Sequence, residues 1–393
     1  MTLAAPLYLS LINFNIIQIG LVYVAVMAFA VTLSLLLGAL GDRRGYKKAL
    51  IISEVFPVVG ALGLALSTSP PVIILSIVVA GVTGLSGGMR GAFSPGMTAF
   101  IASENRDDKS RVGRLSQLTL VSSLFSIVGA GMLISQSLLG GQFGGEGAYR
   151  LLFLAAAALL AASLASLLFL RETERPRKTS RVMQRSSLRY TLNVMVINAF
   201  NGAGIGMAVP LLPLILAIAF RFPVNDAALY VGIIYVPSYA ATMLGSWLSG
   251  RLSGRFDVLS VASFGRVGAG LLGIALGAIF ALQYYGVLTF LPLLAMAMAV
   301  YALRSLVAGF GGPSISALNV RGIHSQDYGT ASSVQSLAQS LATGSSGLSG
   351  YLADAMLPAP ILIGGALQIV SGALYPKLLK GVQSGGGKRR ATA

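Results

Sequence analysis

The stretch GALGDRRGYKK, residues 38–48, places one acid and four bases between two long apolar runs. Each of these runs, 17–40 and 47–67, is long enough to cross a hydrocarbon core of about 30 Å as an α-helix. A short turn between two such helices needs a residue that tolerates unusual backbone angles, and Gly45 meets that need. The stretch therefore predicts a charged turn at one face of a membrane.

The composition of the whole chain supports this prediction. Of 393 residues, 55% are hydrophobic and 10% are charged, which is too apolar for a water-soluble domain of this size. Residues 151–170 are apolar on every face, whereas barrel strands would alternate in polarity. We predict an all-α polytopic membrane protein with twelve spans, the first of them incomplete: 1–12, 17–40, 47–67, 72–101, 113–138, 148–170, 190–218, 228–250, 258–283, 286–318, 329–353 and 358–379.

The net charge of +16 comes mainly from basic loops. Of the 28 Lys and Arg residues, 23 fall in loops on one side of the twelve-span arrangement, and the opposite loops hold only Arg150 and Arg221. By the positive-inside rule, both termini lie in the cytoplasm and the spans lie in the cytoplasmic membrane. The charge thus encodes topology in a lipid bilayer, and no single basic face with interleaved aromatic residues indicates a nucleic-acid partner.

Reactive side chains are few. The chain has no cysteine and one histidine, His324, so it offers no thiol nucleophile, disulfide framework or histidine-rich metal site. GGGKRR at 385–390 lacks the spacing of a phosphate-binding loop and is interpreted as part of a flexible basic tail. We expect no enzymatic activity, no catalytic residue, no metal and no cofactor.

Two sequence echoes indicate that the chain consists of related halves. A span ending in GALGDRRG, residues 38–45, is echoed by a span ending in GRLSGRFD, residues 250–257. SPGMTAF at 94–100 is echoed by GPSISAL at 312–318. Such repeats are typical of secondary transporters, which bind substrate between their halves near the bilayer midplane.

These echoes predict four parts of the chain. They are an N-terminal six-helix half at 1–170, a cytoplasmic linker at 171–189, a C-terminal six-helix half at 190–380 and a basic cytoplasmic tail at 381–393. The linker is too polar to cross a membrane.

GALGDRRGYKK closely resembles motif A of the major facilitator superfamily, roughly G-x-L-a-D-R-x-G-r-k between the second and third helices. The matching residues are Gly38, Leu40, Asp42, Arg43, Gly45 and Lys47. A weaker second copy retains Gly250, Leu252 and Arg255, while Asp257 replaces the second glycine. The resemblance implies two six-helix halves related by a pseudo-two-fold axis, which rock around a central site.

The resemblance also implies a role for the acid of the motif. Asp42 would lie near the N-terminus of the eleventh helix, around Gly329, where the helix dipole favours a carboxylate. That contact would act as a conformational latch that holds the halves together in the outward-open state. The alternative is that the cluster serves only as a topology signal.

The first helix is predicted to be truncated. Only five residues precede Pro6, whereas 23 residues, 190–212, precede the equivalent element of the second half. Two explanations stay open: a misassigned start codon, or a chain that lacks part of this helix.

Charged residues within spans are candidate functional residues, because an uncompensated ion costs at least about 2.5 kcal/mol at the bilayer centre. Arg90 and Arg304 lie near the middle of the fourth and tenth spans. In the family these helices line the central cavity, so the two guanidinium groups would bind an anion. The alternative for Arg304 is a structural arginine, because its surroundings resemble the family's motif B. Glu54 is a candidate proton acceptor, or else pairs with Lys47 near the membrane face.

Three pairs of neutral polar residues are spaced so that each pair shares one face of a helix. Interhelical hydrogen bonding is the alternative to substrate contact for each of them. The pairs are Asn198 with Asn201, Tyr235 with Tyr239, and Gln335 with Gln339.

The sequence thus predicts a secondary active transporter that moves a small organic solute, with a preference for an anion, by alternating access. We expect a monomer from a prokaryote, with protons as a candidate coupling ion. One alternative is a proton-coupled efflux antiporter for amphipathic compounds, although residues 125–134 lack the proline of the antiporters' motif C. Another is a non-transporting sensor or scaffold with the same fold.

Overall fold

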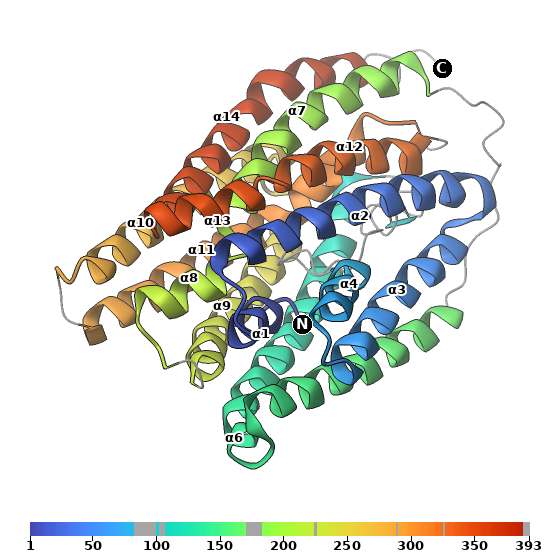
Figure 1. Ribbon diagram of the computed structural model, residues 1–393. Coiled ribbons are helices and arrows are strands. Elements are labelled where there is room, and N and C mark those ends of the chain that lie inside the picture. The colour runs from blue at the N-terminus through green and yellow to red at the C-terminus, as the bar shows by residue number, and fades with distance from the viewer. Residues whose placement is uncertain are drawn as a thin grey trace.

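The computed structural model describes residues 1–81, 100–101, 107–169, 183–223, 226–287, 290–324 and 327–387, without the side chains of residues 39, 42, 43 and 380–387. Within these ranges the chain is almost entirely helical and contains no β-strand (Figure 1). The helices are α1 (Ala4–Leu11), α2 (Ile16–Arg44), α3 (Tyr46–Leu66), α4 (Pro70–Ala80), α6 (Asp108–Leu168), α7 (Arg185–Ala208), α8 (Leu212–Ala219), α9 (Ala227–Arg251), α10 (Val258–Tyr284), α11 (Phe290–Arg321), α12 (Tyr328–Thr343), α13 (Ser346–Ala355) and α14 (Ala359–Gly387).

Eight helical segments in the described part of the chain are long and apolar enough to cross a membrane. They are Ile16–Gly38, Tyr46–Leu66, Asp108–Leu168, Arg185–Ala219, Ala227–Arg251, Val258–Tyr284, Phe290–Arg321 and Ala359–Leu379. The prediction of an all-α polytopic membrane protein is therefore confirmed.

The longest helix, α6, is interrupted by a turn. Gly144 has φ 73° and ψ 159°, which lie outside the helical region and suit a residue without a side chain. Figure 1 shows α6 folding back on itself, so that it has two arms. The two arms correspond to the predicted spans 113–138 and 148–170.

Two other predicted spans are broken. Residues 190–218 form α7 and α8, which are separated next to Pro210 and Pro213, where the backbone lacks N–H donors. Residues 329–353 form α12 and α13, which are separated at Gly344. In addition, α7 begins at Arg185, within the range predicted as linker.

We refer to α1 to α6 as the N-terminal bundle and to α7 to α14 as the C-terminal bundle. Contacts between the bundles are made chiefly by α6 against α9 and by α2 against α12 and α13. Figure 1 shows α2 lying alongside α12 and α13. We call the end where α2 meets α3 the Gly45 end, and the end where α6 folds back the Gly144 end.

Close contacts at the Gly45 end join the bundles through small residues. A Cβ atom placed on Gly38 of α2 would overlap the Oγ of Ser333 on α12 and lie 2.6 Å from its Cβ. A Cβ atom placed on Gly250 of α9 would lie 2.9 Å from the Cβ of Ser116 on α6. The two glycines that begin the two motif copies thus make matching contacts with the opposite bundle.

Similar contacts occur toward the Gly144 end. A Cβ atom on Gly20 of α2 would lie 2.8 Å from the carbonyl oxygen of Ser346 on α13. A Cβ atom on Gly232 of α9 would lie 3.0 Å from the carbonyl oxygen of Ala130 on α6. The same two helix pairs therefore touch near both ends.

Two apolar clusters draw side chains from both bundles. The first cluster, toward the Gly144 end, includes Leu9, Val26, Ile215, Val231 and Phe280. The second cluster, toward the Gly45 end, includes Leu37, Leu50, Val194, Leu318 and Tyr375. Burial of these side chains across the interface holds the bundles together at each end.

Candidate functional site

A cavity of about 320 Å³ lies between the two apolar clusters. Along α14, Gln368 lines the cavity between Ile361 of the first cluster and Tyr375 of the second. Along α7 and the residues just after it, the lining residues likewise lie between Ile197 of the second cluster and Leu211 of the first. The cavity is thus positioned midway along the helices, and its volume is at the lower end of the range for small-molecule sites, about 300–1,000 Å³.

Five residues that the sequence singled out line this cavity: Asn198, Asn201, Arg304, Gln335 and Gln339. They come from α7, α11 and α12, so the fold brings together residues more than 140 positions apart. Within the described lining there are two arginines and no carboxylate. The site is therefore polar and basic.

The neutral lining residues are buried yet incompletely hydrogen-bonded. Asn198, Asn201 and Gln335 are each no more than 3% exposed. Gln335 donates from Nε2 to the carbonyl oxygen of Asn319 at 2.9 Å, but the Oδ1 atoms of Asn198 and Asn319 have no partner in the described chain. Because buried polar atoms are normally satisfied, these two acceptors are available to water or to a bound solute.

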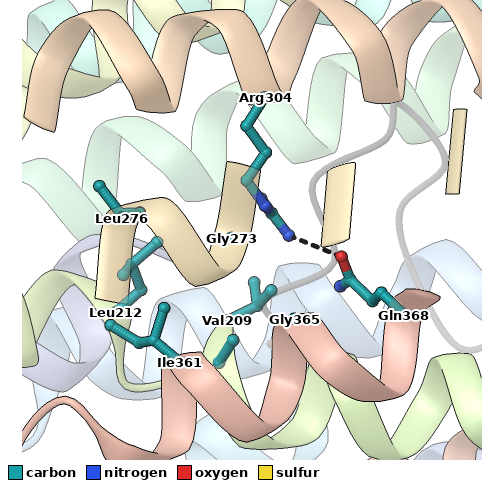
Figure 2. Close-up of a pocket in the computed structure, with 9 residues that line it drawn as sticks. Val209, Leu212, Gly273, Leu276, Arg304, Ile361, Gly365 and Gln368 are labelled. Carbon is teal, nitrogen blue, oxygen red and sulfur yellow. Dashed lines mark hydrogen bonds between the residues drawn. The ribbon is translucent and has the colours of Figure 1, made fainter. Parts of the chain in front are cut away.

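Arg304 extends from α11 across the cavity to α14. Its Nη2 donates to Oε1 of Gln368 at 3.3 Å, as Figure 2 shows. Leu212, Leu276 and Ile361 lie on the side of Arg304 away from Gln368 in the same view. Arg304 therefore marks the border between the polar cavity and the first apolar cluster.

Arg266 on α10 is a lining residue that the sequence analysis missed. Its Nε atom is buried and has no hydrogen-bond partner among the described residues, and Tyr375 lies beside its guanidinium group. The sequence could have identified Arg266, because it is a charged residue within the predicted span 258–283. Charge within a span is the criterion that selected Arg90 and Arg304.

The pair Tyr235 and Tyr239 does not line the cavity. The ring centroid of Tyr235 lies 5.9 Å from that of Tyr239 and 5.1 Å from that of Tyr301. Tyr235 is 4% exposed and belongs to the first apolar cluster. Aromatic packing, rather than solute contact, accounts for the shared face of this pair.

The two remaining charged candidates are not part of the cavity that the structure describes. Glu54 is half-buried on α3, which packs against α4 and α6 and contributes nothing to the lining. Arg90 lies outside the described residues.

The first motif copy forms the turn predicted for it. Gly45 has φ 101° and ψ 147° between α2 and α3, a conformation that is essentially restricted to glycine. Leu40 packs against the second apolar cluster, and Lys47 donates from Nζ to the carbonyl oxygen of Leu168 at 2.7 Å. The side chains of Asp42 and Arg43 lie outside the described part, but Gly38, one turn before Asp42, contacts α12 near Gly329.

The second motif copy repeats the turn with a different use of its acid. Gly254 has φ 91°, which matches the positive φ of Gly45. Asp257 caps its own helix α10, because its Oδ2 accepts a hydrogen bond from the Ser260 backbone N–H at 3.1 Å. Leu252 is half-buried and Arg255 is exposed in the same turn.

An ion pair links the bundles at the Gly45 end, and the sequence analysis did not find it. Arg321 at the end of α11 places Nε 2.8 Å from Oδ2 of Asp108 at the start of α6. Beside it, Arg111 of α6 donates from Nη2 to the hydroxyl of Tyr328 on α12 at 2.8 Å. Both contacts join residues that are more than 200 positions apart in the chain.

Two bundles of apolar helices that enclose a polar cavity between apolar clusters have the architecture expected of a polytopic membrane transporter. The model of the Major Facilitator Superfamily matches residues 1–347, so the chain belongs to this family. Members of this family are membrane transporters, so the protein is a membrane transporter and not an enzyme.

Among solved structures, the fold is similar to that of the human organic anion transporter MFSD10 (TETRAN). The TM-score is 0.67 at 15% sequence identity, over 91% of this chain and 83% of that chain. A comparison with curated protein sequences found no match.

Proposed function

We propose that this protein is a secondary active transporter that moves a small organic anion through the central cavity by alternating access. The observation that carries the proposal is that Arg266 and Arg304 line one cavity whose described lining has no carboxylate. A buried cation without a counter-charge costs at least about 2.5 kcal/mol near the bilayer centre. An anionic solute offsets that cost, whereas a cationic solute increases it.

The neutral polar residues that line the cavity support the same proposal. The amides of Asn198, Asn201 and Gln335 offer both donors and acceptors for the polar groups of a solute. MFSD10 is described as an organic anion transporter, and at 15% identity that likeness supports the fold alone. The preference for an anion therefore rests on the arginines of this chain.

We further propose that the protein is a monomer in the cytoplasmic membrane with both termini in the cytoplasm. The basic loops favour this orientation by the positive-inside rule. In it, the Gly45 end of the bundle faces the cytoplasm.

The experiment is uptake into proteoliposomes of anionic, neutral and cationic organic solutes, with and without an imposed pH gradient. Native protein is compared with Arg304→Gln and with the control Arg251→Gln, whose arginine packs over Trp247 outside the cavity, 5.1 Å from the ring centroid. We expect anion uptake that Arg304→Gln abolishes and Arg251→Gln retains.

The other outcomes of this experiment are equally informative. Transport of cations or neutral amphipathic compounds that survives Arg304→Gln contradicts anion transport and favours efflux of amphipathic compounds. The absence of any gradient-driven movement favours a non-transporting role. Stimulation by the pH gradient identifies the proton as the coupling ion.

A further inference from the structure

The two arginines of the cavity lie at different levels along the packed helices α10 and α14. At the first level, a Cβ atom on Gly273 would lie 3.5 Å from Cα of Gly365 and 3.6 Å from Nε of Arg304. At the second level, a Cβ atom on Gly372 would lie 2.9 Å from Cβ of Arg266. Arg304 reaches the first level from α11, whereas Arg266 belongs to α10 itself.

The separation of these levels follows from helix geometry. Seven residues separate Arg266 from Gly273 on α10, and seven separate Gly365 from Gly372 on α14. At 1.5 Å per residue, the levels are about 10 Å apart along the helix axes. Gln368 lies between them on α14 and lines the same cavity.

Both guanidinium groups keep donors that no acid among the described residues satisfies. Arg304 has a neutral partner, Gln368, whose Oε1 accepts at 3.3 Å. The Nε of Arg266 is buried with no partner in the part of the chain that the structure describes. Since a guanidinium group has five donors and binds a carboxylate more strongly than a neutral amide, each arginine is suited to its own acidic group.

We infer that the cavity takes a dianion whose two acidic groups are separated, one bound by Arg304 and the other by Arg266. This inference rests on the proposed function and narrows its substrate class. In the absence of the solute, Gln368 occupies the acceptor position at Arg304. A monoanion would neutralise one arginine and leave the other without a counter-charge.

The test uses the straight-chain dicarboxylates from succinate to suberate and the monocarboxylates of equal chain length. Each competes for uptake of a labelled anion into proteoliposomes that contain native protein, Arg266→Gln, Arg266→Lys or Arg251→Gln. We expect at least one dicarboxylate to compete about tenfold better than its monocarboxylate in native protein, as befits one additional charge-assisted contact. Arg266→Gln should lose this preference, while Arg266→Lys and Arg251→Gln should retain it.

Two results would overturn the inference without affecting anion transport. One is equal competition by dicarboxylates and monocarboxylates in native protein, and the other is an unchanged preference in Arg266→Gln. If no anion competes at all, the proposed function fails first. Where Arg266→Gln does not elute as a folded protein in gel filtration, the chain-length series on native protein decides the question.

Discussion

Oδ2 of Asp108 and Nε of Arg321 lie 2.8 Å apart, so the first turn of α6 is tied to the last turn of α11. The two side chains are 24% and 35% exposed, so solvent screens the pair and its contribution is modest. The position of the pair matters more than its contribution to stability, because the pair joins the two bundles at the end opposite the Gly144 turn.

Breaking this pair should open the cavity toward the Gly45 end. The chain has no native cysteine, so Ser336→Cys gives a single label in the cavity wall. We expect Asp108→Asn to raise the rate at which the Ser336→Cys protein is labelled from the Gly45 side by about 1.4- to fivefold, because a partly exposed pair is worth about 0.2–1 kcal/mol. The control is Glu146→Gln, which removes the pair with Arg150 at 3.4 Å within α6. An unchanged rate would show that the Asp108 pair does not close the cavity.

A methyl group on Gly38 should separate α2 from α12. Because the added Cβ would overlap Ser333, we expect Gly38→Ala to reduce the free energy of unfolding by about 1–3 kcal/mol, measured by denaturation in detergent. The second substitution Ser333→Gly should restore part of this loss. Gly113→Ala is the control, since nothing lies within 4 Å of the Cβ position there. Equal effects at Gly38 and Gly113 would contradict the close contact.

The turn at Gly45 should tolerate no side chain. Its φ of 101° and ψ of 147° are essentially restricted to glycine, so we expect Gly45→Ala to cost about 1–3 kcal/mol of stability. The helical Gly140 has open space around it, and Gly140→Ala should have little effect. Thermal unfolding of the two variants side by side measures the difference, and equal melting temperatures would refute the strain.

A carboxylate at residue 368 should compete with an anionic substrate. Gln368→Glu would place an acid beside Arg304, where the amide oxygen now accepts at 3.3 Å. We expect this variant to fold but to lose at least about tenfold in apparent affinity for the anion. Gln368→Leu, which introduces no charge, serves as its comparison in the same uptake assay. Retention of native affinity by Gln368→Glu would mean that the anion does not bind at Arg304.

The membrane-spanning fold was predictable from the sequence because hydropathy acts over about 20 consecutive residues. The interruption next to Pro210 also had a local signal, since proline removes a helical donor. The break at Gly344 had none that distinguishes it from the glycines inside other helices. There the contacts of α12 and α13 with α2 are tertiary, and no local pattern encodes them.

The site was predictable only in part, because local patterns do not encode tertiary contacts. Helical spacing indicated that Gln335 and Gln339 share one face of their helix. It did not indicate which neighbouring helices that face would contact. Tyr235 and Tyr239 have the same spacing and pack into an apolar cluster instead. The ion pair of Asp108 with Arg321 depends entirely on how distant segments meet.

If the two bundles rock as proposed, the small-residue contacts between them constrain that motion. A rigid body held at two points rotates only about the line through them. If the contacts of Gly38 and Gly250 stay closed, that line is a hinge at the Gly45 end, and the rotation separates the opposite end. If the contacts of Gly20 and Gly232 stay closed instead, the second hinge lies toward the Gly144 end and the rotation reverses. Under the alternating access proposed above, two such hinges, one of them closed at any time, would allow the cavity to open to either side without the two bundles coming apart.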